Sequence, residues 1–345
     1  MRIAVPQSLR WAASRLKAKL FPGALILLYH RVAELPSDPQ RLCVTPGHFA
    51  EHLEILKKRL RPVSLGEMGR SLDEGVQARF PVVITFDDGY ADNLHQAKPI
   101  LERYDTPATV FVTAGQVGSE QEFWWDELER LLLRSGPLPE SLRLTVDGNA
   151  MSWQLDGAVP YDEERYRDWN VELEGNPTPR HTLYRSLSQF LRPLAESERH
   201  QVIQELQTWA GVNGVGRLTH RVLSPEEILR LAEGGLVNIG AHSLTHGALS
   251  SLSVTGQRVE VEGSKRRLEK ILGRPVKSFA YPFGSRSDYT PESVTLVREA
   301  GFDFACANFP GIVWRSSDHF QLPRLLVRDW DGEVFERQLR RWLGG

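Results

Sequence analysis

The sequence predicts an α/β fold in which parallel strands curl into a barrel. Short apolar runs recur along the chain, at 24–29, 82–86, 108–113, 236–241, 277–282, 302–307 and 325–327. Stretches with helical periodicity separate these runs, and this alternation is typical of parallel strands joined by crossover helices. About seven such repeats favour a barrel over a flat, doubly wound sheet.

The individual runs and the stretches between them carry clear strand and helix signals. The run VVITF at 82–86 is rich in β-branched side chains and lacks strict alternation, as in strands buried on both faces of a sheet. Thr45 and Pro46 precede one amphipathic segment, and Ser224, with Glu227 three residues later, precedes another. Both patterns are helix-start signals, so we expect helices to begin there.

The alternation of strand and helix breaks between about residues 114 and 223. This stretch contains FWWDELERLLLRSG, where Trp124 and Trp125 are expected to anchor it, then the strand-like SLRLTVDGNAMSW and a helical segment from Arg180 to about Ala210. Plain loops in compact domains rarely exceed ~15 residues. We therefore predict that residues 1–345 form a single barrel domain with a folded insertion at about 114–223.

Composition limits the partners that the chain can have. With 42 basic and 44 acidic residues, the net charge is −2, so overall charge gives no reason to expect binding to nucleic acid. Cys43 and Cys306 have no His or Cys neighbours at metal-binding spacing and are expected to be free core thiols. The composition does not fix the oligomeric state.

The N-terminal region gives an expectation about the compartment. Its longest apolar stretch, GALILLY, is too short for a secretory or membrane-spanning segment, which predicts a cytoplasmic protein. Residues 7–20 are basic and carry leucines at helical spacing. This segment could close one end of the domain, or it could contact the inner membrane peripherally.

Polar side chains and a tight turn follow several of the predicted strands. The residues concerned are His30, Asp87, Asp88, His242 and Phe283. In a parallel barrel the carboxyl ends of the strands meet at one rim, so we expect these residues to converge. Adjacent Asp87 and Asp88 can serve one site only if the backbone turns between them, and Gly89 permits such a turn.

His242 and His246 are four residues apart, a spacing that lets two imidazoles bind one ion. Together with the carboxylate of Asp88 they form a donor set that leaves coordination positions open for water, as in catalytic zinc sites. We therefore predict a divalent metal, preferably Zn²⁺. His48 and His52 share the same spacing, but no third ligand is near them in the sequence, and both are expected at the surface.

Three segments resemble the motifs of a known family. TFDDGYADN (85–93), HSLTH (242–246) and AYPFG (280–284) are similar to the first three motifs of the polysaccharide deacetylase family, the NodB-homology domain of carbohydrate esterase family 4. The resemblance covers residues 80–115 and 220–327. It implies a distorted (β/α)7 barrel, a divalent metal and hydrolysis of an N-acetyl or related acyl group on an amino sugar. By this resemblance the metal ligands are Asp88, His242 and His246, the general base is Asp87, and the backbone N–H of Phe283 helps to hold the oxyanion.

The chain departs from the family pattern at two positions. Ala280 stands where the third motif usually begins with Arg, and LPRLL (322–326) lacks the usual His of the last motif. However, LLYHRV (27–32) is similar to the N-terminal segment of a circularly permuted subgroup, in which the strand that bears this His comes first. His30 thereby becomes the candidate general acid, and Arg324 the candidate partner of Asp87.

These observations predict metal-dependent hydrolysis of an N-acyl group on a bacterial glycan or a lipid-linked sugar precursor. Two alternatives stay open, a catalytically degenerate glycan-binding barrel and a deformylase-type amide hydrolase that acts on a non-polymeric sugar. A glycosidase also uses two carboxylates, but these lie ~5 to 9.5 Å apart across the scissile bond. Adjacent Asp87 and Asp88 sharing one metal do not fit that arrangement.

Overall fold

The computed structural model describes residues 23–74, 80–146, 149–155 and 161–344. Each of the apolar runs predicted as a strand contains one. These strands are β1 (Gly23–Tyr29), β5 (Pro81–Phe86), β6 (Ala108–Val112), β9 (Val237–Ala241), β10 (Ser278–Ala280), β11 (Phe304–Cys306) and β13 (Leu325–Leu326). The segment at 7–20, for which membrane contact was considered, lies outside the described residues.

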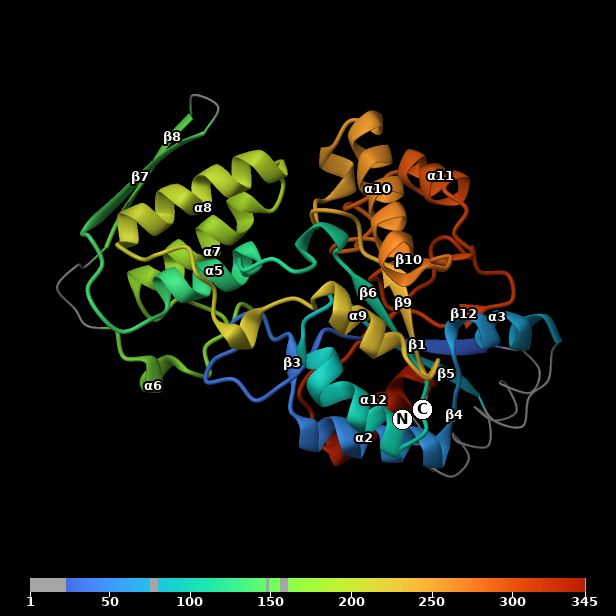
Figure 1. Cartoon of the computed structure of the whole chain (residues 1–345). Coiled ribbons are helices and arrows are strands. Elements are labelled where there is room, and N and C mark those ends of the chain that lie inside the picture. The colour runs from blue at the N-terminus through green and yellow to red at the C-terminus, as the bar shows by residue number, and fades with distance from the viewer. Residues whose placement is uncertain (1–22, 75–79, 147–148, 156–160, 345) are drawn as a thin grey trace, which may run out of the picture.

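The strands form a mostly parallel sheet that curls into a barrel, which confirms the predicted fold class (Figure 1). Their order is β11-β10-β9-β6-β5-β1, and β13 pairs in parallel with β1 on the other side. A parallel bridge between Cys306 and Leu322 brings the far edge of the sheet toward β13. Short strands extend the sheet: β12 (Val313–Trp314) lies antiparallel to β1, and β4 (Arg61–Pro62) pairs with β5.

Helices connect the strands and cover the outside of the sheet. They are α2 (Pro46–Arg59), α3 (Leu65–Glu74), α4 (Lys98–Arg103), α9 (Pro225–Ala232), α10 (Val254–Leu272), α11 (Pro291–Glu299) and α12 (Gly332–Trp342). The predicted caps are present. The hydroxyl of Thr45 accepts a hydrogen bond from the N–H of His48, and Ser224 forms a capping box with Glu227. In the described part of the chain, no helix is long and apolar enough to cross a membrane.

The surface prediction for His52 is wrong. Its side chain is fully buried between α2 and α12, where its ring stacks on Phe335 with centroids 4.0 Å apart. One ring nitrogen lies 3.3 Å from the hydroxyl of Tyr29 and the other 2.6 Å from the carbonyl of Trp330. Burial lowers the pKa of His52 to about 4, so the ring is neutral at pH 7. The amphipathic pattern of α2 did not predict this burial, because the helix that covers His52 is α12, at the far end of the chain.

The stretch that interrupts the alternation forms a body with its own apolar core. It contains α5 (Trp124–Leu132), the hairpin of β7 (Ser141–Val146) and β8 (Asn149–Gln154), α6 (Glu163–Tyr166), α7 (Pro179–Leu191) and α8 (Glu196–Ala210). Buried residues from Leu128 to Ala210 make one hydrophobic cluster separate from that of the barrel. Figure 1 shows this body beside the barrel. Cys43 and Cys306 are both buried free thiols, as predicted.

Candidate active site

Asp87, the first residue after β5, is buried in a two-pronged ion pair with Arg324. Its two carboxylate oxygens accept hydrogen bonds of 2.7 Å from Nη1 and Nη2 of Arg324. The exposed fractions are 4% for Asp87 and 1% for Arg324. Burial alone would raise the pKa of Asp87, but the positive charge of Arg324 outweighs it and leaves the pKa at about 2. The partner expected from the sequence is therefore in place, and Asp87 is ionised at neutral pH.

Asp88 faces the two histidines because the backbone turns at this residue. Its φ is 73°, and Gly89 follows with a φ of 84°, so the left-handed turn expected at Gly89 already begins one residue earlier. Oδ1 of Asp88 lies 3.6 Å from Nε2 of His242 and 3.2 Å from Nε2 of His246. A positive φ is costly for a residue with a Cβ, and such strain is often found at functional sites.

The donor atoms of Asp88, His242 and His246 fit a divalent cation. All three side chains are buried, and the donor atoms lie within 4.8 Å of one another. Nδ1 of His242 lies 2.8 Å from the carbonyl of Ala280, which fixes the ring so that Nε2 turns toward Asp88. Among the described residues, no hydrogen-bond donor reaches the buried Oδ1 of Asp88. Two imidazole nitrogens and one unpartnered carboxylate oxygen form a set that suits zinc.

The loop that carries the two histidines is held from both sides. Ser243 and His246 have φ values of 60° and 57°. Glu260 of α10 accepts hydrogen bonds of 2.9 Å from the backbone N–H groups of Leu244 and Thr245. On the other side, the buried side chain of Arg199 from α8 donates to the carbonyls of Thr245 at 2.9 Å and His246 at 3.3 Å. A barrel helix and an insertion helix thus fix the position of the ligands.

Aromatic rings enclose His246. Phe283 and Trp125 both approach its ring edge-on, each with a centroid distance of 4.8 Å. Phe283 has a φ of 58°, and its own N–H finds no acceptor among the described residues, so it is free to bind a ligand. The guanidinium of Arg192 in the insertion lies 4.3 Å from the centre of the Phe283 ring. At the carboxyl-end rim of the barrel, the insertion residues Trp125 and Arg192 therefore line one side of the site.

His30 lies at the same rim, directly beside Asp87. The strands β1 and β5 pair in parallel with Tyr29 opposite Phe86, so the residues that follow them are neighbours. The N–H of Asp87 donates to the carbonyl of Tyr29 at 3.0 Å. The imidazole of His30 is partly buried and makes no hydrogen bond within the described chain. Burial lowers the pKa of His30, while the charges of Asp88 and Asp87 oppose this shift.

The structure thus brings together every site residue that the sequence nominated. Asp87, Asp88, His242 and His246 lie within 4 Å of at least one other member, and His30 and Phe283 flank them. Arg199 and Trp125 were not predicted as parts of the site. Trp125 was expected only to anchor the insertion, and nothing in the spacing linked either residue to His246.

Comparison with protein families identifies one match. The model of the family described as "Polysaccharide deacetylase" matches residues 75–136 and 189–305. The matched segments contain Asp87, Asp88, His242, His246 and Phe283, and they leave out the middle of the insertion, residues 137–188. This match agrees with the resemblance of the three motifs.

Individual proteins give the same picture. The poly-beta-1,6-N-acetyl-D-glucosamine N-deacetylase of Staphylococcus aureus (strain MRSA252) is 19% identical over 335 residues, which are 93% of this chain and 83% of that protein. YxkH of Bacillus subtilis (strain 168) is 28% identical over 123 residues, only 35% of this chain and 41% of YxkH. Among solved structures, the Streptococcus pyogenes deacetylase PplD, in complex with acetate, has a TM-score of 0.56 at 17% identity and covers 92% of this chain and 98% of its own.

Proposed function

This chain belongs to the polysaccharide deacetylase family, and we propose that it removes N-acetyl groups from amino sugars of a bacterial glycan by metal-dependent hydrolysis. The observation that carries the proposal is that two neighbouring carboxylates have different surroundings. Asp87 is held ionised by Arg324, and Asp88 faces His242 and His246 with an unpartnered oxygen. A base beside a three-donor site is what hydrolysis needs and what a glycan-binding barrel does not need.

Asp88, His242 and His246 would hold the ion. A divalent cation at this place, preferably Zn²⁺, supplies a water of lowered pKa and polarises the acyl carbonyl. The chain contributes the geometry: Ala280 fixes the ring of His242, and Arg199 fixes the loop of His246. All three donors are buried, so the ion would be held away from bulk solvent.

Asp87 acts as the general base. Oδ2 of its carboxylate lies 3.8 Å from Nε2 of His242, so the base stands next to the donor set and could accept a proton from a water held at that site. Arg324 donates to both oxygens of Asp87 and so keeps the group ionised and oriented. The buried position of Arg324 also means that this orientation does not depend on salt in the solvent.

Phe283 and His30 act on the two ends of the reacting amide. The N–H of Phe283, which has no acceptor among the described residues, would stabilise the oxyanion of the tetrahedral intermediate. His30 protonates the nitrogen of the leaving amine, a step for which its place beside Asp87 is suited. Burial lowers the pKa of His30, and the charges of Asp88 and Asp87 act against this shift and so favour the protonated form that an acid needs.

The similarity to the Staphylococcus aureus enzyme supports a substrate class. That similarity extends over 93% of this chain, so it includes the insertion and not only the motifs. We therefore propose β-1,6-linked N-acetylglucosamine oligomers as the substrate, with a polymer or a lipid-linked precursor as the natural form.

The test is acyl-group release from a panel of sugars. Metal-free protein is prepared with a chelator and reloaded with Zn²⁺, and acetate release is then measured from β-1,6- and β-1,4-linked N-acetylglucosamine oligomers. N-formylated sugars in the same panel address the deformylase alternative. We expect acetate release that requires both the metal and Asp87, with Asp303→Asn, a change at an exposed carboxylate, as the matched control. A metal-loaded protein that releases neither acetate nor formate from any of them would contradict the proposal.

A further inference from the structure

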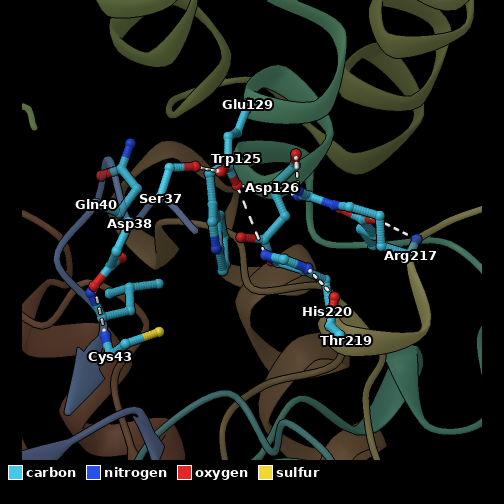
Figure 2. Close-up of polar contacts among 12 residues, drawn as sticks. Ser37, Asp38, Gln40, Cys43, Trp125, Asp126, Glu129, Arg217, Thr219 and His220 are labelled. Atoms are coloured by element: carbon cyan, nitrogen blue, oxygen red, sulfur yellow. Dashed lines mark hydrogen bonds and ion pairs between the residues drawn. The ribbon is translucent and has the colours of Figure 1, made fainter. Parts of the chain in front are cut away.

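A second group of buried ionisable side chains lies where the insertion joins the barrel. Asp126 and Glu129 come from α5, near the start of the insertion, and His220 comes from the short helix η3 (Leu218–His220), near its end. Their exposed fractions are 6%, 5% and 3%, and one ligand atom of each lies within 4.8 Å of the others. Figure 2 shows the three side chains converging on one point beside Trp125.

Two polar atoms in this group have no partner. Nδ1 of His220 lies 3.0 Å from the hydroxyl of Thr219, but Nε2 makes no hydrogen bond to any described residue. It lies 3.7 Å from Oε2 of Glu129, which is too long for a hydrogen bond. Similarly, Oδ2 of Asp126 accepts from the hydroxyl of Tyr90 at 2.6 Å, whereas Oδ1 has no donor in the described part of the chain. Polar groups of side chains this deeply buried are normally paired, so two unpaired atoms on the lining of one small cavity leave room for a ligand.

The charges around the group leave a negative excess. Arg217 binds both oxygens of Glu122, at 3.0 Å and 2.8 Å, and reaches Oε2 of Glu129 at 3.1 Å. One guanidinium therefore serves two carboxylates. The other arginine at this point, Arg31, is paired with Asp92 at 2.9 Å, so no ion pair within the described residues includes Asp126. A buried carboxylate without an ion pair of its own is costly, and a bound cation would remove that cost.

The space at this point suits a single atom. A cavity of about 10 Å³ is lined by Asp126, Glu129 and His220, together with Ser37, Trp125 and the paired Arg31. This volume corresponds to about one water-sized sphere, too small for an organic ligand. The ring of His220 presents Nε2 to the group while Thr219 binds the opposite nitrogen, which is how metal-binding imidazoles are commonly oriented.

We propose that Asp126, Glu129 and His220 bind a second divalent cation of the zinc class. One imidazole nitrogen and two carboxylate oxygens are ligands that Zn²⁺ accepts in proteins. This ion joins the two ends of the insertion, 94 residues apart, and fixes Trp125 against His246. It has a structural role, because Arg31 and Arg217 near it pair with carboxylates and no unpaired base in the described part of the chain faces it. The proposal does not depend on the proposed function.

The experiment counts metal ions in the full-length protein. Chelator-stripped protein is loaded with Zn²⁺, freed of excess metal and assayed by elemental analysis. We expect two ions per chain in the wild type and one in the double variant Asp88→Ala, His246→Ala, which lacks two active-site donors. In that double variant, Zn²⁺ should also raise the midpoint of thermal unfolding by several degrees, because an ion that binds only the folded state stabilises it.

Substitution of His220 then tests the site itself. Adding His220→Gln to the double variant should abolish both the remaining ion and the thermal shift. His181→Gln is the matched control, because His181 is a buried histidine of the insertion whose two nitrogens are already partnered by Tyr161 and Thr178. If His220→Gln misfolds by circular dichroism, Asp126→Asn and Glu129→Gln replace it. A wild type that holds one ion, or a double variant that holds none, would overturn the proposal.

Discussion

The barrel and the insertion both reach the candidate active site, but they contribute different kinds of group. The barrel places the ionisable side chains Asp87 and Asp88 directly after β5, a central strand with partners on both sides. The insertion contributes Arg199, which contacts loop carbonyls, and Trp125, which packs edge-on against the ring of His246. The groups suited to chemistry therefore come from the strand ends, and the insertion supplies groups that hold them in position.

This difference follows from how each region is held. The residues that end parallel strands are fixed by hydrogen bonds on both sides, so their relative positions change little when a connection lengthens. The insertion packs around its own hydrophobic cluster, and it meets the barrel through the small cluster of Tyr90, Phe123, Trp125 and Val222. Changes within the insertion can therefore alter this side of the site without disturbing the strands.

The largest effect is expected from a barrel residue, Asp87. The substitution Asp87→Asn removes the base but leaves the donors Asp88, His242 and His246 untouched, so it should lower kcat by at least ~10³-fold while metal content stays the same. The measurement is acetate release at saturating substrate together with elemental analysis. Activity within a few fold of wild type would show that Asp87 is not the base.

The next largest effect on activity is expected from His30, which also belongs to the barrel. His30→Ala should leave the fold and the metal content intact and cut kcat by ~10²-fold or more, because the acid acts on the leaving amine and not on substrate binding. KM should change much less than kcat. His200→Ala, at an exposed position on α8, is the control. An equal rise in KM with unchanged kcat would assign His30 to binding instead.

The strand-end residues could be predicted from the sequence because their positions depend on local signals. VVITF predicted a buried strand, and the polar residues after it and after the run at 236–241 had to meet at one rim if the sheet was parallel. Arg324 was found because the family motif lacked its usual Arg at Ala280. Each of these inferences needed only strand identity and topology.

The contacts between the insertion and the barrel could not be predicted in this way. Arg199 reaches the carbonyl of His246 across 47 positions of sequence, and no period or motif connects them. Asp126 and Glu129 stand three residues apart on one helix face, which is visible in the sequence, but His220 joins them only through tertiary packing. His52 was misassigned for the same reason, since α12 covers it from the end of the chain.

A substitution in the insertion tests whether that region positions the ligands. Arg199→Met removes the donors to the carbonyls of Thr245 and His246 and keeps most of the apolar stem. Supporting groups of this kind typically change metal affinity by 10- to 100-fold. We expect the affinity of the active site for Zn²⁺, measured by competition with a chelator, to fall within that range.

The control for this prediction is another arginine of the insertion. Arg185 also donates to backbone carbonyls, among them that of Val171 at 2.6 Å, but these belong to the insertion itself. Arg185→Met should therefore leave metal affinity unchanged. If the two variants weaken metal binding equally, the effect comes from general destabilisation, and the insertion has no specific role in holding His246.

The smallest effect concerns stability in acid, where the two regions carry matching groups. Burial lowers the pKa of His52 in the barrel and of His181 in the insertion to about 4. Because the unfolded pKa is near 6.5, the unfolded state binds more protons between these values, and stability is lost as pH falls through that window. Between pH 7 and pH 5, each histidine should remove about 1 to 2 kcal/mol from the free energy of unfolding.

His52→Gln should therefore reduce the loss measured by urea unfolding at the two pH values, with His48→Gln on the same helix as control. If the barrel and the insertion unfold together, His181→Gln reduces the loss in the same transition. If they unfold separately, it acts only on an earlier transition, and the contacts made by Arg199 and Trp125 are then too weak to couple the two regions.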